Sequence, residues 1–599
     1  MKRYLLLCCI LVVVATTLLA DPSATVVRLD RTHQVIVDFG ASDCWLGDYV
    51  GRYFSSTMKE RAAKMLFARS FDRGGNPEGI GLSNWRVNLG AGSATQGSDS
   101  NIDDPTRRTE CYLNDDGVTY NWSHSAGQQY FMQKALDYGV ENILFFSNSA
   151  PIYYTANGKA NKVNMLPWGA NLRDDAYDDF AEYMATVTKH FVDLGYPISY
   201  ISPVNEPQYE WTSGQEGSPW YNTEVTQLVK ELDEALTRHG LSTKILIPEA
   251  GKWNYLTESN AIINNYGYDQ INQFFNPSQT STYVGNLAHV ANAVAGHSYW
   301  TFRTNTELVN RRTAVATAAA QMGVQVYQTE WSMLDEPPTA SAGFPSGGYE
   351  EATYMDIALY MGKVIYCDMV YANASSWSYW TAFAQEQWGQ KNRFYLLRVL
   401  ANGDSGPESY GDLTNGGTIL DNRNLWVLGN YSRFIRPGYT RVELSGADNL
   451  NALMGSAYVS PDGNEVVVVY VNMANSPSTV TLTAEADDGR VISTIKKYTT
   501  SESLALHFDR NLPETYVSGQ EVEIPARSVV TLLLGLTKDQ QHLQGDVNGD
   551  GLVDIDDVNA IINAILGITE WHSDYDLTGD GIVDVDDVNA IINIILRIQ

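Results

Sequence analysis

Positive charge, cysteine and long apolar runs are all scarce in this sequence of 599 residues. Its 40 Lys and Arg stand against 70 Asp and Glu, which gives a formal charge of −30. Such an excess of acid argues against nucleic acid or an anionic membrane surface as a partner. The sequence shows no zinc-ligand spacing, no phosphate-binding glycine loop and no Ser-His-Asp arrangement. It therefore gives no indication of a catalytic metal, a nucleotide site or a serine hydrolase.

The one long apolar run lies at the start of the chain. Met1-Lys2-Arg3 is followed by apolar residues 4–20, which end just before Asp21-Pro22. This pattern is typical of a secretory signal peptide cut near Ala20, so we expect a secreted protein that is extracellular or associated with the cell surface. The alternative is an uncleaved transmembrane anchor, although the run is close to the lower length limit for crossing a bilayer.

Three of the five cysteines lie beyond the predicted signal peptide: Cys44, Cys111 and Cys367. An exported protein can oxidise one pair, and Cys44 and Cys111 fall in loops expected on the same face. We therefore predict a disulfide between these two, with two free thiols as the alternative. Cys367 lies in a strongly apolar helical stretch and is predicted to be a buried thiol.

Strand-like and helix-like segments alternate over the first two thirds of the chain. Residues 174–194 and 223–239 have apolar side chains at helical spacing. Eight such alternations predict an α/β fold, a (β/α)8 barrel with long loops. The predicted strands are 36–39, 82–89, 141–147, 198–205, 244–249, 295–300, 324–330 and 375–380.

Short alternating strands separated by turn sequences follow from about Tyr431, and they predict an antiparallel β-sandwich. Two strands near the N-terminus, 25–29 and 34–37, are predicted to join it. The predicted division of the chain is a signal peptide (1–20), N-terminal strands of the sandwich (21–37), the catalytic barrel (38–430), the β-sandwich (431–536), a linker (537–543) and a calcium-binding module (544–599).

The last 56 residues are acidic and repeat themselves. Eleven Asp and one Glu stand against one Arg, a net charge of −11. Two twelve-residue loops each lead into an apolar helix and each carry the oxygen pattern and central glycine of an EF-hand. We therefore predict two structural calcium ions, with a solvated acidic tail as the alternative. The expected ligands are Asp546, Asn548, Asp550, the Leu552 carbonyl, Asp554 and Asp557, and then Asp576, Thr578, Asp580, the Ile582 carbonyl, Asp584 and Asp587.

Two glutamates carry the predicted chemistry. Glu206 follows the strand at 198–205 and Glu330 ends the strand at 324–330. The carboxyl ends of barrel strands open onto one face, so the two carboxylates should face each other across its mouth. Such a pair cleaves glycosidic bonds, with one group protonating the leaving oxygen and the other attacking the anomeric carbon or activating water. No cofactor is expected for this chemistry.

Other strand ends supply candidate partners for these glutamates. Asn205 is expected to bind the sugar 2-hydroxyl, and Arg86 to keep Glu330 ionised. His297 and Tyr299 are expected to orient Glu330, and Trp377 to form a floor on which a sugar stacks. The alternatives are an internal salt bridge for Arg86 and ordinary packing for His297 and Trp377.

Four motifs together resemble glycoside hydrolase family 30, a member of clan A. They are Asp38–Trp45, Ser202–Pro207, Gln328–Trp331 and Asn430–Gly438. The resemblance implies a barrel with a side sandwich and a retaining mechanism, with Glu206 as acid/base and Glu330 as nucleophile. It also implies substrate contacts for Asp43, Trp45 and Trp331. Within the family, residues 40–45, 85–93 and 203–211 most resemble the endo-β-1,6-galactanase group, whereas 147–154 departs from the family pattern at the third strand.

The tail departs from an ordinary EF-hand, because position 12 is Asp and neither loop follows an obvious helix. A paired loop–helix repeat of this kind resembles a type I dockerin. That resemblance implies a small all-α calcium-binding domain and a cohesin-like or cell-surface protein as partner.

Taken together, the sequence predicts a secreted retaining endo-glycosidase that hydrolyses β-1,6-linked galactan, the side chains of arabinogalactan. One alternative keeps the chemistry and changes the substrate to β-1,6-glucan or xylan. Another is a carbohydrate-binding or assembly subunit without activity. The sequence leaves open the sugar and its linkage, endo or exo action, the protein partner and the oligomeric state.

Overall fold

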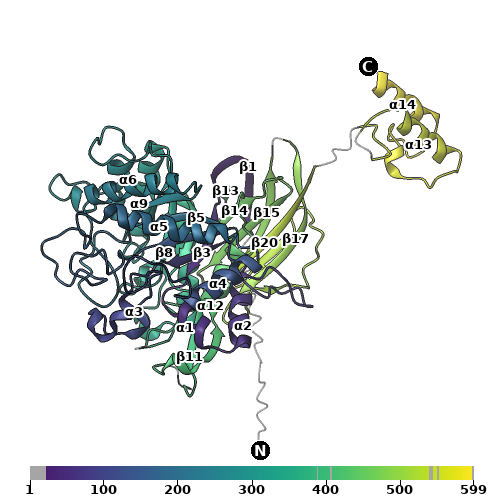
Figure 1. Cartoon of the computed structure of the whole chain (residues 1–599). Helices are drawn as coiled ribbons and strands as arrows, with labels where there is room; N and C mark the ends of the chain where they lie inside the picture. Colours follow the sequence, from purple (N-terminus) through teal and green to yellow (C-terminus); the bar gives the residue numbers. More distant parts are fainter. Residues whose placement is uncertain are drawn as a thin grey trace, which may run out of the picture. The chain divides into compact units, whose positions relative to one another are not determined.

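A closed barrel of eight parallel strands lies at the centre of the first part of the chain (Figure 1). The computed structural model describes residues 22–387, 389–404, 406, 408–486, 488–538, 544–549 and 552–596. The predicted (β/α)8 barrel is confirmed, and its strands follow one another around the barrel in chain order. They are β2 (Asp38–Ser42), β3 (Asn84–Asn88), β4 (Asn142–Phe146), β5 (Ile198–Ser202), β6 (Lys244–Ala250), β7 (Val290–His297), β8 (Gln325–Trp331) and β9 (Ala374–Tyr379).

Helices follow these strands, and the longer amphipathic ones, such as α5 and α6, bury one apolar face. In α5 the helical spacing places Phe180, Met184 and Phe191 on the buried face. Burying a side chain of this size stabilises the fold by about 1.5–3 kcal/mol. The helices are α1 (Leu46–Tyr53), α2 (Ser56–Phe67), α3 (Ser93–Gln96), α4 (Ala126–Asp137), α5 (Tyr177–Asp193), α6 (Asn222–Arg238), α7 (Trp253–Thr257), α8 (Gln270–Phe275), α9 (Asn305–Met322), α10 (Gly348–Glu351), α11 (Tyr354–Val370) and α12 (Arg423–Ser432).

The sixth barrel strand starts earlier than the sequence predicted, at Val290 instead of residue 295. Its first half is rich in alanine, which has low strand propensity and therefore masked the strand in the sequence. Ala291, Ala293 and Ala295 pack inside the barrel with Leu246 and other buried side chains. Small residues on this strand thus leave room for the larger side chains of its neighbours.

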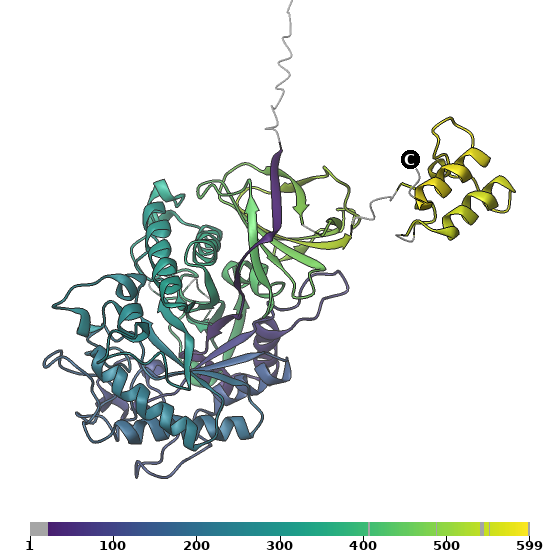
Figure 2. The same ribbon diagram turned by 90° about the horizontal axis from the view of Figure 1, so that it is seen from above.

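Antiparallel strands follow the barrel and form a nine-stranded sheet in the order β18-β17-β20-β15-β14-β13-β1-β16-β19. The N-terminal strand β1, purple in Figure 2, lies among the green strands of this sheet, as the sequence predicted. Strands β13, β18 and β19 were not predicted, and β18 and β19 are only two and four residues long. The strands are β1 (Ser23–Val35), β13 (Thr440–Ser445), β14 (Leu453–Val459), β15 (Glu465–Asn472), β16 (Ser478–Glu485), β17 (Arg490–Thr500), β18 (His507–Phe508), β19 (Glu521–Ile524) and β20 (Ser528–Lys538).

A small three-stranded sheet, which was also not predicted, inserts between the last barrel strand and α12. It consists of β10 (Phe383–Ala384), β11 (Leu397–Ala401) and β12 (Gly417–Asp421), and β10 pairs with β11 in parallel. Because β10 begins only four residues after β9 ends, this insertion starts next to the carboxyl end of the barrel.

The chain divides into two compact units, and the second contains the described residues from Leu536 onward together with Glu485–Val491. Two helices form its core, α13 (Ile555–Ile565) and α14 (Val585–Leu596), through Val558, Ile561 and Ile591. Asp554 begins α13 as its N-cap, where its side chain accepts a hydrogen bond from the Asp556 backbone.

The predicted disulfide is wrong, because Cys44, Cys111 and Cys367 are all free and buried. Cys44 packs inside the barrel beside Leu144 and Phe146, whereas the Cys111 thiol points toward the Leu113 carbonyl oxygen at 3.9 Å. Proximity to one face of the barrel was therefore not enough to bring the two sulfur atoms together. The buried thiol predicted for Cys367 is confirmed.

The predicted signal peptide lies outside the described residues, and no described helix is both long and apolar enough to cross a membrane.

Candidate active site

A cavity of about 540 Å³ opens at the carboxyl ends of the barrel strands and is lined by both predicted catalytic glutamates. Glu330 lies in β8, and Glu206 lies four residues after the end of β5. A carboxylate oxygen of Glu206 and one of Glu330 lie within 4.8 Å of each other and of a ring nitrogen of His297. This spacing is close to the roughly 5–5.5 Å typical of retaining glycosidases.

Two donors hold Glu330. Arg86, in the middle of β3, donates from Nη1 to Oε2 at 2.6 Å, and the Tyr299 hydroxyl donates to Oε1 at 3.0 Å. Arg86 has no exposed surface, so its charge is poorly screened by water. Both oxygens of Glu330 thus face donors, one of them a buried cation, an arrangement that suits a carboxylate nucleophile.

Glu206 pairs with a histidine instead. His297 Nδ1 lies 2.8 Å from Glu206 Oε1 and 3.7 Å from Glu330 Oε1. The sequence predicted that His297 orients Glu330, but its hydrogen bond goes to Glu206. Burial raises the pKa of Glu206 to about 7, and Glu330 adds to the rise, against the opposing effects of His297 and Arg86. Glu206 can therefore hold a proton near neutral pH, as a general acid must.

Asn205 lies beside both groups and lines the cavity. Its Oδ1 accepts a hydrogen bond from Arg86 Nη2 at 3.1 Å. The amide nitrogen is thereby left to donate to a sugar hydroxyl, in keeping with the predicted contact to the 2-hydroxyl.

A third buried carboxylate, Glu249, was not predicted to belong to the site. It lies in β6, has no exposed surface, and accepts hydrogen bonds from His297 Nε2 at 3.0 Å and Ser202 Oγ at 2.6 Å. Arg86 lies 3.5 Å from it. A signal was present in the sequence, because this glutamate ends a predicted strand as Glu206 and Glu330 do.

Several site residues have a left-handed backbone, which non-glycine residues rarely adopt. Glu206 (φ +44°), Trp211 (φ +48°), Glu249 (φ +53°) and Trp300 (φ +51°) share this feature. Each such residue costs about 1–3 kcal/mol, a strain that is often concentrated at functional sites.

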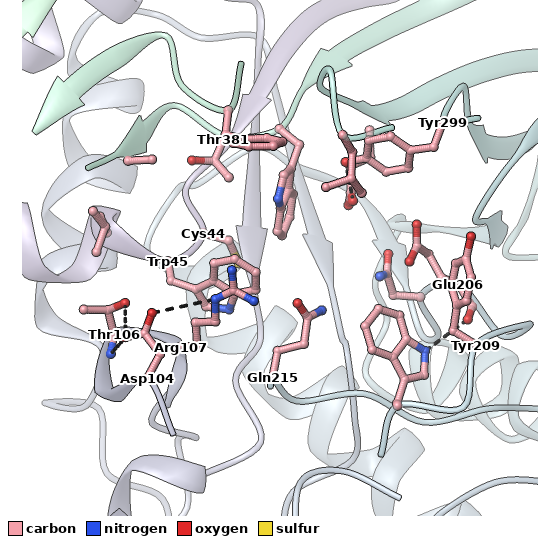
Figure 3. Close-up of a pocket in the computed structure, with 18 of the residues that line it drawn as sticks. Cys44, Trp45, Asp104, Thr106, Arg107, Glu206, Tyr209, Gln215, Tyr299 and Thr381 are labelled. Carbon is pink, nitrogen blue, oxygen red and sulfur yellow. Dashed lines mark hydrogen bonds and ion pairs between the residues drawn. The ribbon is translucent and has the colours of Figure 1, made fainter. Parts of the chain in front are cut away.

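Aromatic side chains form the walls of the cavity, including Trp211, Trp300 and Trp380. Figure 3 shows Trp45 with Arg107 on one side and Glu206 with Tyr209 on the other. The Arg107 guanidinium lies 4.7 Å from the centre of the Trp45 ring, and its Nε lies 3.9 Å from Asp104. Among the described lining residues Arg107 is the one basic side chain, and Asp104 beside it also lines the cavity.

Three predicted substrate contacts lie elsewhere. Trp377 is fully buried, does not line the cavity and donates from Nε1 to Asp368 Oδ2 at 2.9 Å. Side chains alternate along a strand, and this position of β9 faces the surrounding helices. The aromatic ring that reaches the cavity from this strand end is instead that of Trp380.

Trp331 is also buried, against Phe302 and Trp377, and does not line the cavity. Asp43 lies behind the wall, where it accepts hydrogen bonds from the Asn88 backbone at 3.1 Å and from Gln128 Nε2 at 2.7 Å. Trp45, Asn205 and Tyr299 do line the cavity, as predicted.

The predicted calcium ligands lie in the two loops that precede α13 and α14, apart from Asp550, which lies outside the described residues. Asp557 and Asp587 are fully buried. Asp557 accepts hydrogen bonds from the Val547 and Asn548 backbone, and Asp587 accepts one from Thr578. Leu552 and Ile582, expected to bind through their carbonyls, leave their side chains about 60% exposed (61% and 60%).

Two family models match the chain. O-Glycosyl hydrolase family 30 matches residues 22–391, and the glycosyl hydrolase family 30 beta sandwich domain matches residues 438–532. The first match covers more than half of the chain and contains both candidate catalytic glutamates. The predicted β-sandwich is confirmed by the second.

Known proteins resemble the chain over the same region. A conserved exported protein from Bacteroides fragilis has a solved structure that is 31% identical, with a TM-score of 0.76 over 85% of this chain and 100% of that one. Xylanase C from Talaromyces cellulolyticus shares the fold, with a catalytic domain that is 21% identical and has a TM-score of 0.58 over 85% of this chain and 99% of that one.

Among curated proteins, Glucuronoxylanase XynC of Bacillus subtilis (strain 168) is 30% identical over 128 residues. That match spans 21% of this chain and 28% of the relative's length. The barrel, the sandwich and the paired glutamates agree with the two family matches, and the chain belongs to glycosyl hydrolase family 30, a family of O-glycosidases.

Proposed function

We propose that this protein is a retaining endo-glycosidase that hydrolyses β-1,6-linked galactan, with Glu206 as acid/base and Glu330 as nucleophile. The approach of the two carboxylates to within 4.8 Å carries the proposal, because this separation leaves no room for a water molecule between nucleophile and sugar. The choice of galactan as the substrate is based on the resemblance of residues 40–45, 85–93 and 203–211 to galactanases.

In the first step Glu330 attacks the anomeric carbon while the bond from that carbon to the leaving oxygen breaks. Glu206 gives its proton to that oxygen, and a glycosyl ester forms on Glu330. In the second step Glu206 removes a proton from water, the water oxygen attacks the anomeric carbon, and Glu330 leaves as a carboxylate. Arg86 and Tyr299 hold the two oxygens of Glu330 throughout.

A second candidate substrate is glucuronoxylan. Arg107 favours it, because a cation in the cavity wall could pair with the carboxylate of an acidic sugar. The similarity to a glucuronoxylanase, although limited to 128 residues, points the same way.

The purified chain should be incubated with de-arabinosylated arabinogalactan, β-1,6-glucan and glucuronoxylan, and the products analysed. β-1,6-Galacto-oligosaccharides are expected. Products from glucan or xylan alone would show a different substrate specificity with the same retaining mechanism.

Replacing Glu330 with Gln should abolish hydrolysis and preserve sugar binding, whereas full turnover by that variant would exclude Glu330 as nucleophile. Binding without hydrolysis by the unmodified chain would favour a carbohydrate-binding or assembly subunit.

We further propose that residues 544–599 form a dockerin-like module that holds two structural calcium ions. The donor set fits this ion, because all the predicted ligands are oxygens. Asp557 and Asp587 lie in the first turns of α13 and α14, directly after the two loops, where position 12 of such a calcium loop falls.

A cohesin-like or cell-surface protein is the proposed partner of this module. Support comes from its large exposed apolar side chains, which a small soluble domain leaves uncovered mainly where it binds another protein. The most exposed, at 56–68%, are Leu552, Ile555, Leu566, Ile568, Trp571, Ile582, Val585 and Leu596. Secretion is proposed from the apolar start of the chain and is in keeping with the exported relative.

A further inference from the structure

Glu249 has partners on both of its carboxylate oxygens. Its Oε2 faces His297 and Arg86 and also accepts a hydrogen bond from the Thr329 hydroxyl, while its Oε1 accepts one from Ser202. The contacts come from four different barrel strands: β3, β5, β7 and β8. Burial alone would raise the pKa of Glu249, but Arg86, His297 and Ser202 outweigh burial and lower it to about 2.

His297 lies between two carboxylates, with Nε2 on Glu249 and Nδ1 on Glu206. A neutral imidazole has one donor and one acceptor, so it can satisfy two ionised carboxylates only as the doubly protonated cation. Burial alone would lower the pKa of His297, but Glu330 and the hydrogen bonds to Glu206 and Glu249 raise it to about 10. An ionised Glu249 therefore fixes the Nε2 proton and turns Nδ1 toward Glu206.

This buried cluster has more carboxyl groups than cations. Three carboxyl groups, of Glu206, Glu249 and Glu330, share two cations, those of Arg86 and His297. If Glu249 and Glu330 are ionised, the cluster is neutral when Glu206 holds a proton and carries one negative charge when it does not. Other titratable side chains that face Glu206, Glu330 or Arg86 are Cys44, Tyr209, Tyr255 and Tyr299, whose pKa values burial raises, so that they stay neutral. Asp43 also interacts with Arg86, and burial raises its pKa to about 7.

The backbone couples the same residues. The Glu249 carbonyl oxygen accepts the N–H of Glu206 at 2.9 Å, and both residues have a left-handed φ. Glu249 thus contacts the acid/base residue through its main chain and, by way of His297, through its side chain.

We propose that Glu249 is a positioning residue: it fixes the Nε2 proton of His297 and so turns Nδ1 toward Glu206, and as the third carboxylate of the cluster it keeps Glu206 protonated for the first step. This inference rests on the glycosidase function proposed above. Glu249 does not line the cavity, so it acts on the sugar through other residues, and Glu206 is the one that the proposal concerns.

Replacing Glu249 with Gln tests the proposal in kinetics. The amide removes one negative charge, while Glu330 and Glu206 still favour the His297 cation. The cluster then becomes neutral with Glu206 ionised, and the alkaline limb of kcat/KM should move to lower pH by on the order of one unit. Activity on polysaccharide should fall more than activity on an aryl glycoside whose leaving group needs no proton. KM should change little.

Asp38→Asn is the matched control, because it converts another buried barrel carboxylate to an amide at the opposite end of the barrel. Asp38 accepts hydrogen bonds from Ser376, Asn84 and Asn142 and does not line the cavity. The pH profile of the Asp38→Asn variant should match that of the unmodified chain. An unchanged alkaline limb in Glu249→Gln, with equal losses on both substrates, would overturn the proposal.

A readout that does not depend on activity separates this inference from the proposed function. The infrared band of a protonated carboxyl that is lost in Glu206→Gln reports on Glu206, and its titration midpoint should fall in Glu249→Gln. An unmoved midpoint would contradict the proposal even if the protein hydrolyses no tested polysaccharide. If Glu249→Gln does not fold, Glu249→Asp takes its place. Because this variant keeps the negative charge, the titration midpoint of Glu206 should stay where it is. A midpoint that falls by on the order of one pH unit would contradict the proposal.

Discussion

At the residue scale, the site is a set of carboxylates that differ in what surrounds them. Glu330 faces Arg86 and Tyr299, whereas Glu206 faces His297. Strand-end glutamates were predictable from the sequence, because each follows an apolar strand of known direction. The pairing of His297 with Glu206 was not, because strand position alone does not say which of two neighbouring carboxylates a side chain contacts.

The pH dependence of activity should follow from Glu206. The first step needs its proton, and burial raises its pKa to about 7. Activity should therefore fall as pH rises through about 7. A profile of kcat/KM against pH measures this directly. A rate that stays constant well above neutral pH would show that Glu206 is not the general acid.

At the element scale, the period of two along β9 decides which tryptophan reaches the sugar. The sequence identified the right strand and predicted Trp377, but in the structure that ring faces α11 and Trp380 lines the cavity. The sequence shows a strand more clearly than it shows the residue at which the strand ends. The predicted start of β7 was wrong for a related reason, because the alanines at its beginning have low strand propensity.

Two substitutions at this strand end should separate binding from stability. Trp380→Ala should raise KM about tenfold, which is about 1.4 kcal/mol, because a stacking surface in the cavity is lost. Trp377→Phe should leave KM unchanged and lower the melting temperature, because it removes one hydrogen bond to the buried Asp368. Steady-state kinetics and thermal unfolding of both variants check this. The reverse pattern would place the sugar against Trp377.

At the scale of the whole molecule, the barrel and its sheet form one unit and the acidic helical pair belongs to another. The second unit could be predicted from the sequence, because its loop–helix repeat and its excess of aspartate set it apart from the rest of the chain. The three-stranded insertion of β10, β11 and β12 was not visible, because its strands are short and separated by long irregular segments.

Removing calcium should affect the two units differently. EDTA should increase hydrogen exchange in residues 544–599, because the loop carboxylates would then repel one another without a cation between them. Hydrolysis should continue, since the proposed chemistry uses side chains alone. Hydrogen exchange and activity should be measured on the same full-length sample. Protection that is unchanged by EDTA and by added calcium would argue for a solvated acidic tail.

The central claim is that Glu330 forms a covalent bond with the sugar. An activated 2-deoxy-2-fluoro-β-galactoside slows the second step more than it slows transfer to the enzyme, and peptide mass spectrometry then locates the trapped sugar. The account predicts one added sugar, on the peptide that contains Glu330, and none on the Glu330→Gln variant. A sugar attached to another residue, or turnover with inverted anomeric configuration and no adduct, would contradict it.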